Sequence, residues 1–445
     1  MSSSPGPRPR LHAPTLFVVL VLLQAWLVAN PGYFSHDELQ WGARADVASV
    51  GGLPWERWTA VDVFQWRPLT FNLWLLASFA LFDTPQAMHL AWVLAGSSLA
   101  LALAALLLRL GARPATARAA AVVFALGPYA AYVHGWVATM ADLLWVGAAL
   151  ALAHSLLALH RRGGSAWAGA TLAFVLTAAG LLAKEAALAI PGLLALVAVL
   201  HRGGPVGPAA VLGSGLAALA YLGLRLDTLL APGEATTYSL APAAAPGNWA
   251  AYWLYLLRTS TLEVGGTWRA PGLQLAVAAG LLLAMLAAVA RPAPRLALAL
   301  VLGGSLALAP ALPLAFPANQ YGYGFWAWVV CLVALAWPSL GRAGRALVLL
   351  LALASTWHGI NVQRGMHRAG ELQAAFQPAL AAALAGHAGE LRLRTPERDD
   401  WLYRRLGHQV PAWRGQPIGD RVRWVAPGED ADYAVNPDGS LQPLR

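Results

Sequence analysis

Long apolar runs follow one another along this chain, and they constrain its fold more than any other feature. A helix needs about 20 apolar residues to cross roughly 30 Å of hydrocarbon. Of the 445 residues, 58% are hydrophobic and 11% are charged, whereas a soluble domain carries about 25% charged residues. The sequence therefore predicts an all-α polytopic membrane protein embedded in a lipid bilayer. We expect about eleven spans, near residues 14–30, 87–109, 116–133, 138–160, 166–183, 186–201, 207–226, 271–290, 295–314, 321–339 and 343–360.

The distribution of arginine predicts the orientation of these spans. The short connections assigned to one side hold arginines and no acid, whereas loop 31–66 on the other side is rich in acids. An excess of basic residues marks the cytoplasmic side. We therefore predict a bacterial inner-membrane protein with a cytoplasmic N-terminus and a periplasmic C-terminal tail. The net charge of +9 comes from these scattered arginines, so no nucleic-acid partner is predicted. The arginines in question are Arg8, Arg10, Arg109, Arg113, Arg118, Arg161, Arg162, Arg202, Arg291, Arg295, Arg342 and Arg345.

The apolar run 67–83 is assigned to a juxtamembrane helix. A crossing there would place the later basic connections on the wrong side of the membrane. The first run, 14–30, follows a basic segment, so a cleaved signal peptide is the alternative to a first span.

The chain divides into a transmembrane domain, 1–360, and a small polar α/β tail, 361–445. The domain has two external loops. The first, 31–86, carries an acidic pair and juxtamembrane helices, and the second, 227–270, contains the amphipathic stretch NWAAYWLYLLR, which predicts an interfacial helix. The tail contains the strand-like stretches RVRWVA and ADYAV. With Cys331 as the one cysteine, an intramolecular disulfide and a cysteine metal site are both excluded.

The first external loop is the strongest candidate for catalysis. Asp37 and Glu38 follow the first span directly, which places them at the membrane surface. A carboxylate there is suited to act as general base on an acceptor in the aqueous phase, and its neighbour would raise its pKa or hold a cation. The alternative is that both acids are simply solvated and that the loop tryptophans form an interfacial belt. These tryptophans are Trp41, Trp55, Trp58 and Trp66.

The only lysine of the chain, Lys184, stands beside Glu185 in an otherwise uncharged run. One helix over 166–201 would be about 54 Å long at 1.5 Å per residue, so we expect a hairpin with this pair at its external turn. A charge at that depth is costly unless it is paired or faces a polar cavity. Two interpretations remain: a structural ion pair, or an anion site in which Glu185 holds the ammonium.

Further polar residues are predicted on the same face. Arg67 opens the juxtamembrane run, and the stretch LPLAFPANQYGYGFW supplies a late external turn. No metal motif with regular ligand spacing and no glycine-rich phosphate loop occurs, so no metal site or nucleotide is predicted. The remaining polar candidates for ligand binding on this face are His134, Asp142, Asn319, Gln320, Tyr321 and Tyr323.

The order of its sequence motifs makes this chain resemble the GT-C superfamily of integral-membrane glycosyltransferases. The motifs are the acidic pair, WRPL, FALGPYAAYVHGWVATMADLLW, LLAKEAALAIP and LPLAFPANQYGYGF. The resemblance covers about residues 14–360 and is strongest to bacterial relatives of protein O-mannosyltransferases, aminoarabinose transferases and the transmembrane-tetratricopeptide O-mannosyltransferases.

The resemblance implies inverting sugar transfer from a polyprenyl-phosphate donor to an envelope acceptor on the external face. Residue by residue, it implies Asp37 as base with Glu38 beside it, and Lys184, Glu185 and Arg67 at the donor phosphate. The acceptor would be a protein, lipid or glycan. No cofactor is obligatory, because the donor already carries the charge of its leaving group, although a divalent cation is compatible with the reaction.

The sequence departs from the pattern of that superfamily at three points. Asn319 and Gln320 replace an acid and an arginine, which weakens the late turn as a phosphate site. An upstream glutamate is missing, with Tyr132 or His134 nearest, and no tetratricopeptide array follows. Other function classes stay open: a transporter or flippase for an amphiphilic substrate, a polysaccharide polymerase or ligase, and a non-catalytic scaffold.

Overall fold

The structure is a computed structural model that describes residues 12–63, 65–201, 206–230, 239–395, 400–407, 410–426 and 428–444. Some features of the sequence prediction lie outside the described residues. They are Arg8, Arg10, Arg202 and part of the second external loop, 231–238.

Long apolar helices confirm the membrane character of the chain. Among the described residues, seven helices are long and apolar enough to cross a bilayer, or eight if one pair bent by 57° counts as a single span. That pair is α6 (Pro114–Leu126) and α7 (Pro128–Gly135). The others are α5 (Pro85–Arg109), α8 (Met140–Arg161) with η2 (Val137–Thr139), α9 (Ala166–Ala183), α11 (Val206–Leu230), α13 (Gly272–Ala290), α15 (Gly322–Ala336) with η6 (Asn319–Tyr321) and η7 (Trp337–Ser339), and α16 (Arg342–Ala385).

The predicted total of eleven spans is not confirmed, because three of the predicted spans correspond to shorter helices. The run 14–30 is broken at Gln24, the run 186–201 begins with a tight turn, and the run 295–314 ends early. Even the longest of these helices has 15 residues and is only about 23 Å long, so none of them covers a bilayer alone. The elements concerned are α1 (Ala13–Leu22), α2 (Ala25–Val28), η3 (Glu185–Leu188), α10 (Ala189–His201) and α14 (Pro294–Leu308).

The two ends of the helix bundle differ in charge. The turn that follows α5 and the turn that follows α8 are held together, since Arg161 donates a hydrogen bond to the carbonyl of Arg109. The last turn of α13 packs on the first turn of α16 at Ala288 and Gly344. Among the described residues, these turns contain most of the arginines of the predicted cytoplasmic side, so we call them the arginine end.

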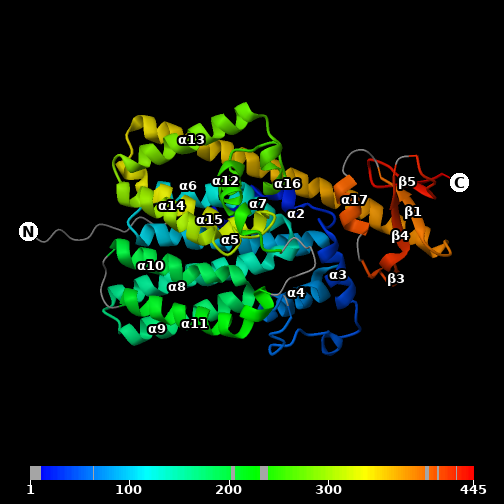
Figure 1. Cartoon of the computed structure of the whole chain (residues 1–445), viewed down its shortest axis with the longest axis horizontal. Coiled ribbons are helices and arrows are strands. Elements are labelled where there is room, and N and C mark those ends of the chain that lie inside the picture. Colours follow the sequence, from blue (N-terminus) through cyan, green and yellow to red (C-terminus); the bar gives the residue numbers. More distant parts are fainter. Residues whose placement is uncertain are drawn as a thin grey trace, which may run out of the picture.

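The first external loop and the C-terminal strands lie at the opposite end of the molecule from the arginine end (Figure 1). The loop contains α3 (His36–Ala45), η1 (Val50–Gly52) and α4 (Pro68–Leu81). With 14 residues, α4 is too short to span, in keeping with a juxtamembrane helix. In the second external loop, α12 (Ala245–Tyr255) ends in buried aromatic residues, so this end of the helix packs on the protein, and its place at the membrane interface stays a prediction. The remaining elements of that loop are η4 (Pro242–Ala244) and η5 (Val264–Arg269).

The predicted domain boundary at residue 360 falls inside α16, which continues to Ala385. Beyond it lies a sheet in the order β4-β1-β5-β6, in which β1 is parallel to β4 and β5, and β6 is antiparallel to β5. Phe376 of α16 packs on Tyr403 and Trp424, so the end of this helix belongs to the core of the tail. The elements are β1 (Leu391–Arg394), α17 (Asp400–Gly407), β2 (Ala412–Trp413), β3 (Gln416–Pro417), η8 (Gly419–Arg421), β4 (Val422–Val425), β5 (Tyr433–Val435) and β6 (Leu441–Pro443).

Candidate functional site

A polar cavity of about 310 Å³ lies where the first external loop meets the ends of the bundle helices. Its wall comes from α3, α4, the junction that precedes α8, the turn after α9 and the turn that opens α15. Six of the residues predicted from the sequence to form the site line this cavity: Asp37, Arg67, Asp142, Lys184, Gln320 and Tyr321.

Asp37 is the accessible acid of the first loop. It lies in the first turn of α3, where Ser35 is the N-cap and accepts a hydrogen bond from the Asp37 amide. The Ser35 hydroxyl also lies 3.1 Å from the Asp37 carboxylate, and the His36 ring nitrogen lies 3.6 Å from it. With a side chain 38% exposed, Asp37 faces the cavity with an oxygen available to a ligand.

Glu38, predicted beside Asp37 as a catalytic acid, has a different position. It is buried and completes the capping box of α3, accepting hydrogen bonds from the amides of Phe34 and Ser35. Its other oxygen accepts from the amide of Val137, at 3.1 Å, and so fixes the junction that precedes α8. Burial raises the pKa of Glu38 to about 8. Glu38 does not line the cavity, so the geometry assigns it to the positioning of Asp37.

Lys184 pairs with Asp142, which corrects the predicted pairing with Glu185. The ammonium lies 2.6 and 2.8 Å from the two oxygens of Asp142, and both side chains are almost fully buried. Lys184 has extended backbone angles at the end of α9. Successive side chains of an extended segment point to opposite sides, which explains why Lys184 and Glu185 diverge. The Lys184 ammonium also lies 4.3 Å from the centre of the Tyr321 ring.

Glu185 pairs with Arg67. The guanidinium donates two hydrogen bonds to the carboxylate, at 2.9 and 2.5 Å, a bidentate geometry that is stronger than a single bond. Thr70, one turn into α4, donates a hydrogen bond to the carbonyl of Ala183. These contacts fix the start of α4 against the turn after α9, so both cations of the predicted phosphate site lie on one wall of the cavity.

Aromatic side chains form another wall of the cavity. Trp41 stacks on Trp74 at 4.8 Å and on Phe71 at 5.0 Å. The Arg44 guanidinium lies 4.4 Å from the Trp41 ring and pairs with Glu56 at the rim, at 2.8 Å. An aromatic face beside polar groups suits a ligand that has both an apolar ring face and hydroxyl groups.

Two buried polar atoms in residues that line the cavity lack a partner. Among the described residues, the Gln320 carbonyl oxygen and the Trp74 indole nitrogen are buried without a hydrogen bond. Buried polar groups are normally satisfied, but neither atom has surface open to the cavity, so a ligand there does not satisfy them unless the side chain moves.

Three of the residues predicted for sugar or acceptor binding lie outside the cavity, as Glu38 and Glu185 do. His134 is buried between Gln24 and Tyr323, at 2.6 and 3.0 Å, and thereby joins the broken first helix to α15. Asn319 accepts a hydrogen bond from the amide of Val264 and donates one to the hydroxyl of Tyr255, so it fixes the second external loop. His134, Tyr323 and Asn319 are therefore structural in this geometry.

Several residues of the site were not predicted from the sequence. Trp136 and Thr139 line the cavity from the short segment between α7 and α8, and the Trp136 indole donates a hydrogen bond to Ser35. Gln40 and Arg44 follow Asp37 on α3. The available signal was helical spacing, because residues three or four positions apart share one helix face.

The cavity balances its charges. Three acids and three bases line it: Asp37, Glu56, Asp142, Arg44, Arg67 and Lys184. In the part of the chain that the structure describes, no group of three or more His, Cys, Asp or Glu side chains is arranged to hold a metal ion. The arrangement can offer an accessible carboxylate, two fixed cations and an aromatic wall to one ligand.

No protein-family model matches this chain, and neither does any curated protein or solved structure.

Proposed function

We propose that this protein is a membrane glycosyltransferase that moves a sugar from a polyprenyl-phosphate donor to an acceptor at the end of the bundle opposite the arginine end. The observation that carries the proposal is the convergence of Asp37, Arg67 and Lys184, from three separate segments, around one cavity with an aromatic wall. The GT-C-like motif order in the sequence supports the same function.

The proposed reaction assigns a role to each of these groups. The Asp37 carboxylate takes the proton from an acceptor hydroxyl. The acceptor oxygen attacks the anomeric carbon, the bond from that carbon to the phosphate oxygen breaks, and polyprenyl phosphate leaves with the electron pair. Attack from the face opposite the phosphate inverts the sugar.

The cations act on the leaving group in this proposal. Lys184 and Arg67 are held in place by Asp142 and Glu185, so they need no reorganisation as charge builds up on the phosphate. The aromatic pair Trp41 and Trp74 packs against the sugar ring.

Transfer in vesicles tests the proposal. The full chain is reconstituted with radiolabelled polyprenyl-phosphate mannose as the probe, and release of free polyprenyl phosphate is measured with and without envelope extract as the acceptor source. We expect acceptor-dependent release that falls roughly 10²-fold or more in Asp37→Asn. The matched control is Asp46→Asn, which lies just after the same helix and does not line the cavity. Equal release by wild type and Asp37→Asn would exclude Asp37 as the base.

A transporter is the second candidate, favoured by the 57° bend between α6 and α7 and by the break after α9. Interrupted helices around a polar site are typical of transporters. Translocation of the labelled donor across the vesicle membrane without release of polyprenyl phosphate would favour this function over transfer.

A further inference from the structure

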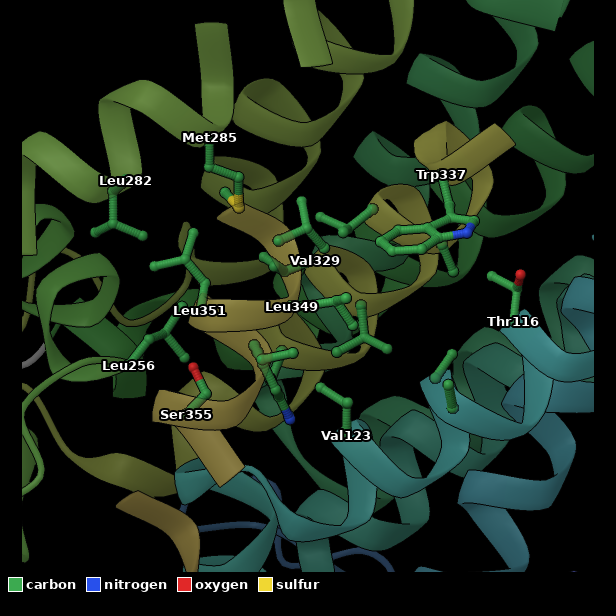
Figure 2. Close-up of a pocket in the computed structure, with 18 of the residues that line it drawn as sticks. Thr116, Val123, Leu256, Leu282, Met285, Val329, Trp337, Leu349, Leu351 and Ser355 are labelled. Atoms are coloured by element: carbon green, nitrogen blue, oxygen red, sulfur yellow. The ribbon is translucent and has the colours of Figure 1, made fainter. Parts of the chain in front are cut away.

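A second cavity, of about 320 Å³, lies among α6, α13, α15 and α16 and shares no residue with the polar cavity. Figure 2 shows apolar side chains directed into it from these helices, with Thr116 and Trp337 toward one end and Leu256 and Ser355 toward the other. Apart from two tryptophans, Thr116 and Ser355 are its only polar lining residues. A cavity of this composition does not hold water, so its natural occupant is an apolar chain.

The length of this apolar cavity matches one leaflet of a bilayer. Its lining runs from Trp326 in α15 to Trp337 at the start of η7, which is about 16 Å at 1.5 Å per residue. Half of a hydrocarbon core of roughly 30 Å is about 15 Å. The Thr116–Trp337 end belongs to the arginine end of the bundle, because Thr116 lies in the first turn of α6 and Trp337 immediately precedes the turn into α16.

Positive charge gathers at that end of the cavity. Arg113 is the N-cap residue of α6, and Arg342 is the first residue of α16; both are exposed. Arg345 lies 5.6 Å from the Trp337 ring, and its guanidinium donates hydrogen bonds to backbone carbonyls, which leave its charge uncompensated. The connections at this end contain no acid. Arginines next to an apolar cavity are complementary to a lipid with an anionic headgroup.

We propose that the apolar cavity is a binding site for an anionic phospholipid of the arginine-end leaflet, with an acyl chain between α6, α13, α15 and α16 and the phosphate against Arg113 and Arg342. Lipid tails gain no hydrophobic free energy by leaving one apolar environment for another. Selectivity therefore comes from the headgroup charge, and retention comes from close packing of the chain.

Native mass spectrometry of the full chain in detergent tests this proposal, with phosphatidylglycerol and phosphatidylcholine of identical acyl chains as the probes. We expect wild type to retain phosphatidylglycerol in preference to phosphatidylcholine. Ala352→Phe places a ring in the cavity and should lower retention at least about ten-fold. The matched control is Ala220→Phe, at an exposed position on α11 outside the cavity, and it should retain lipid like wild type.

A charge variant keeps the test decisive if Ala352→Phe does not fold. Arg113→Gln with Arg342→Gln changes only exposed side chains and should abolish the preference, a loss of about ten-fold or more. Equal retention of the two lipids by wild type would overturn the proposal. So would unchanged phosphatidylglycerol retention in a folded Ala352→Phe protein. Neither outcome depends on sugar transfer, so this proposal and the proposed function fail separately.

Discussion

The two cavities have almost the same volume, about 310 and 320 Å³, but opposite chemistry. The polar cavity holds six charged residues in its wall, whereas the apolar cavity holds none and has its arginines just outside one end. A buried charge needs a partner at close range, and the polar cavity supplies one for Lys184 and for Arg67. The contrast teaches that the polar cavity carries its charges within its wall as close pairs, whereas the arginines outside one end of the apolar cavity have no ion-pair partner among the described residues.

The largest effect should come from the buried pair of the polar cavity. Among the described residues, Lys184→Ala leaves the buried Asp142 carboxylate with only the Trp145 indole as a hydrogen-bond donor, so we expect a loss of roughly 3–5 kcal/mol in the free energy of unfolding. Thermal unfolding in detergent measures it. Asp142→Ala combined with Lys184→Ala should recover much of the loss, because no charge is then left unpaired.

The matched change in the apolar cavity is Met285→Leu, which conserves volume and should cost less than about 1.5 kcal/mol. If Lys184→Ala unfolded at the same temperature as Met285→Leu, charge pairing would not distinguish the two regions.

An intermediate effect on stability is expected at Glu38, which lies outside the polar cavity and fixes α3 and the junction before α8 in its wall. In Glu38→Gln the amide nitrogen meets a backbone N–H in place of an acceptor, and we expect a loss of roughly 1–3 kcal/mol at pH 5. Unfolding monitored from pH 4.5 to 8 measures the difference between the two proteins.

The sign of the pH dependence follows from the raised pKa of Glu38, about 8 in the folded chain. Between the unfolded and the folded pKa, the folded state holds the Glu38 proton and the unfolded state releases it. The contribution of this protonation to the free energy of unfolding is therefore complete below the unfolded pKa. It is lost as the pH rises through about 8. The difference in free energy of unfolding between wild type and Glu38→Gln should therefore become smaller as the pH rises. A constant difference would show that Glu38 is ionised throughout.

The smallest effect is expected at the rim of the polar cavity. Arg44 and Glu56 form a pair 2.8 Å apart with side chains 40% and 28% exposed, and pairs of this kind contribute about 0–1 kcal/mol. Arg44→Gln should leave the unfolding temperature nearly unchanged. A loss of stability as large as that of Lys184→Ala would mean that the Arg44–Glu56 pair holds the cavity wall in place.

Composition and charge predicted much of the fold. Apolar length identified the long helices, and arginine counting separated the two ends of the bundle. The helix breaks at Gln24 and Gly127 were not predicted. A hydropathy value is averaged over a window of residues, so it does not register a single polar contact or bend. The true end of α16 escaped as well, since its last turns are buried by the sheet of the tail and not by lipid.

The site was predicted in part. Charge counting placed Asp37, Arg67 and Lys184 on one face, and they share one cavity. The partner of Lys184 was misassigned because adjacency in sequence suggested Glu185, whereas Asp142 reaches it through the packing of α8 on α9. A contact between residues 42 positions apart cannot be read from local spacing. Glu38 was placed with Asp37 for the same reason, although its first-turn position also fits a capping box.

The most direct test of the central claim compares ligand retention when one cavity or the other is filled. Ala138 lines the polar cavity and Ala352 lines the apolar one, so Ala138→Phe and Ala352→Phe are matched changes. Each purified protein is loaded with polyprenyl-phosphate mannose and weighed by native mass spectrometry. We predict that wild type and Ala352→Phe retain the lipid-linked sugar and that Ala138→Phe loses it at least about ten-fold. Retention by a folded Ala138→Phe protein equal to that of wild type would contradict a donor site in the polar cavity.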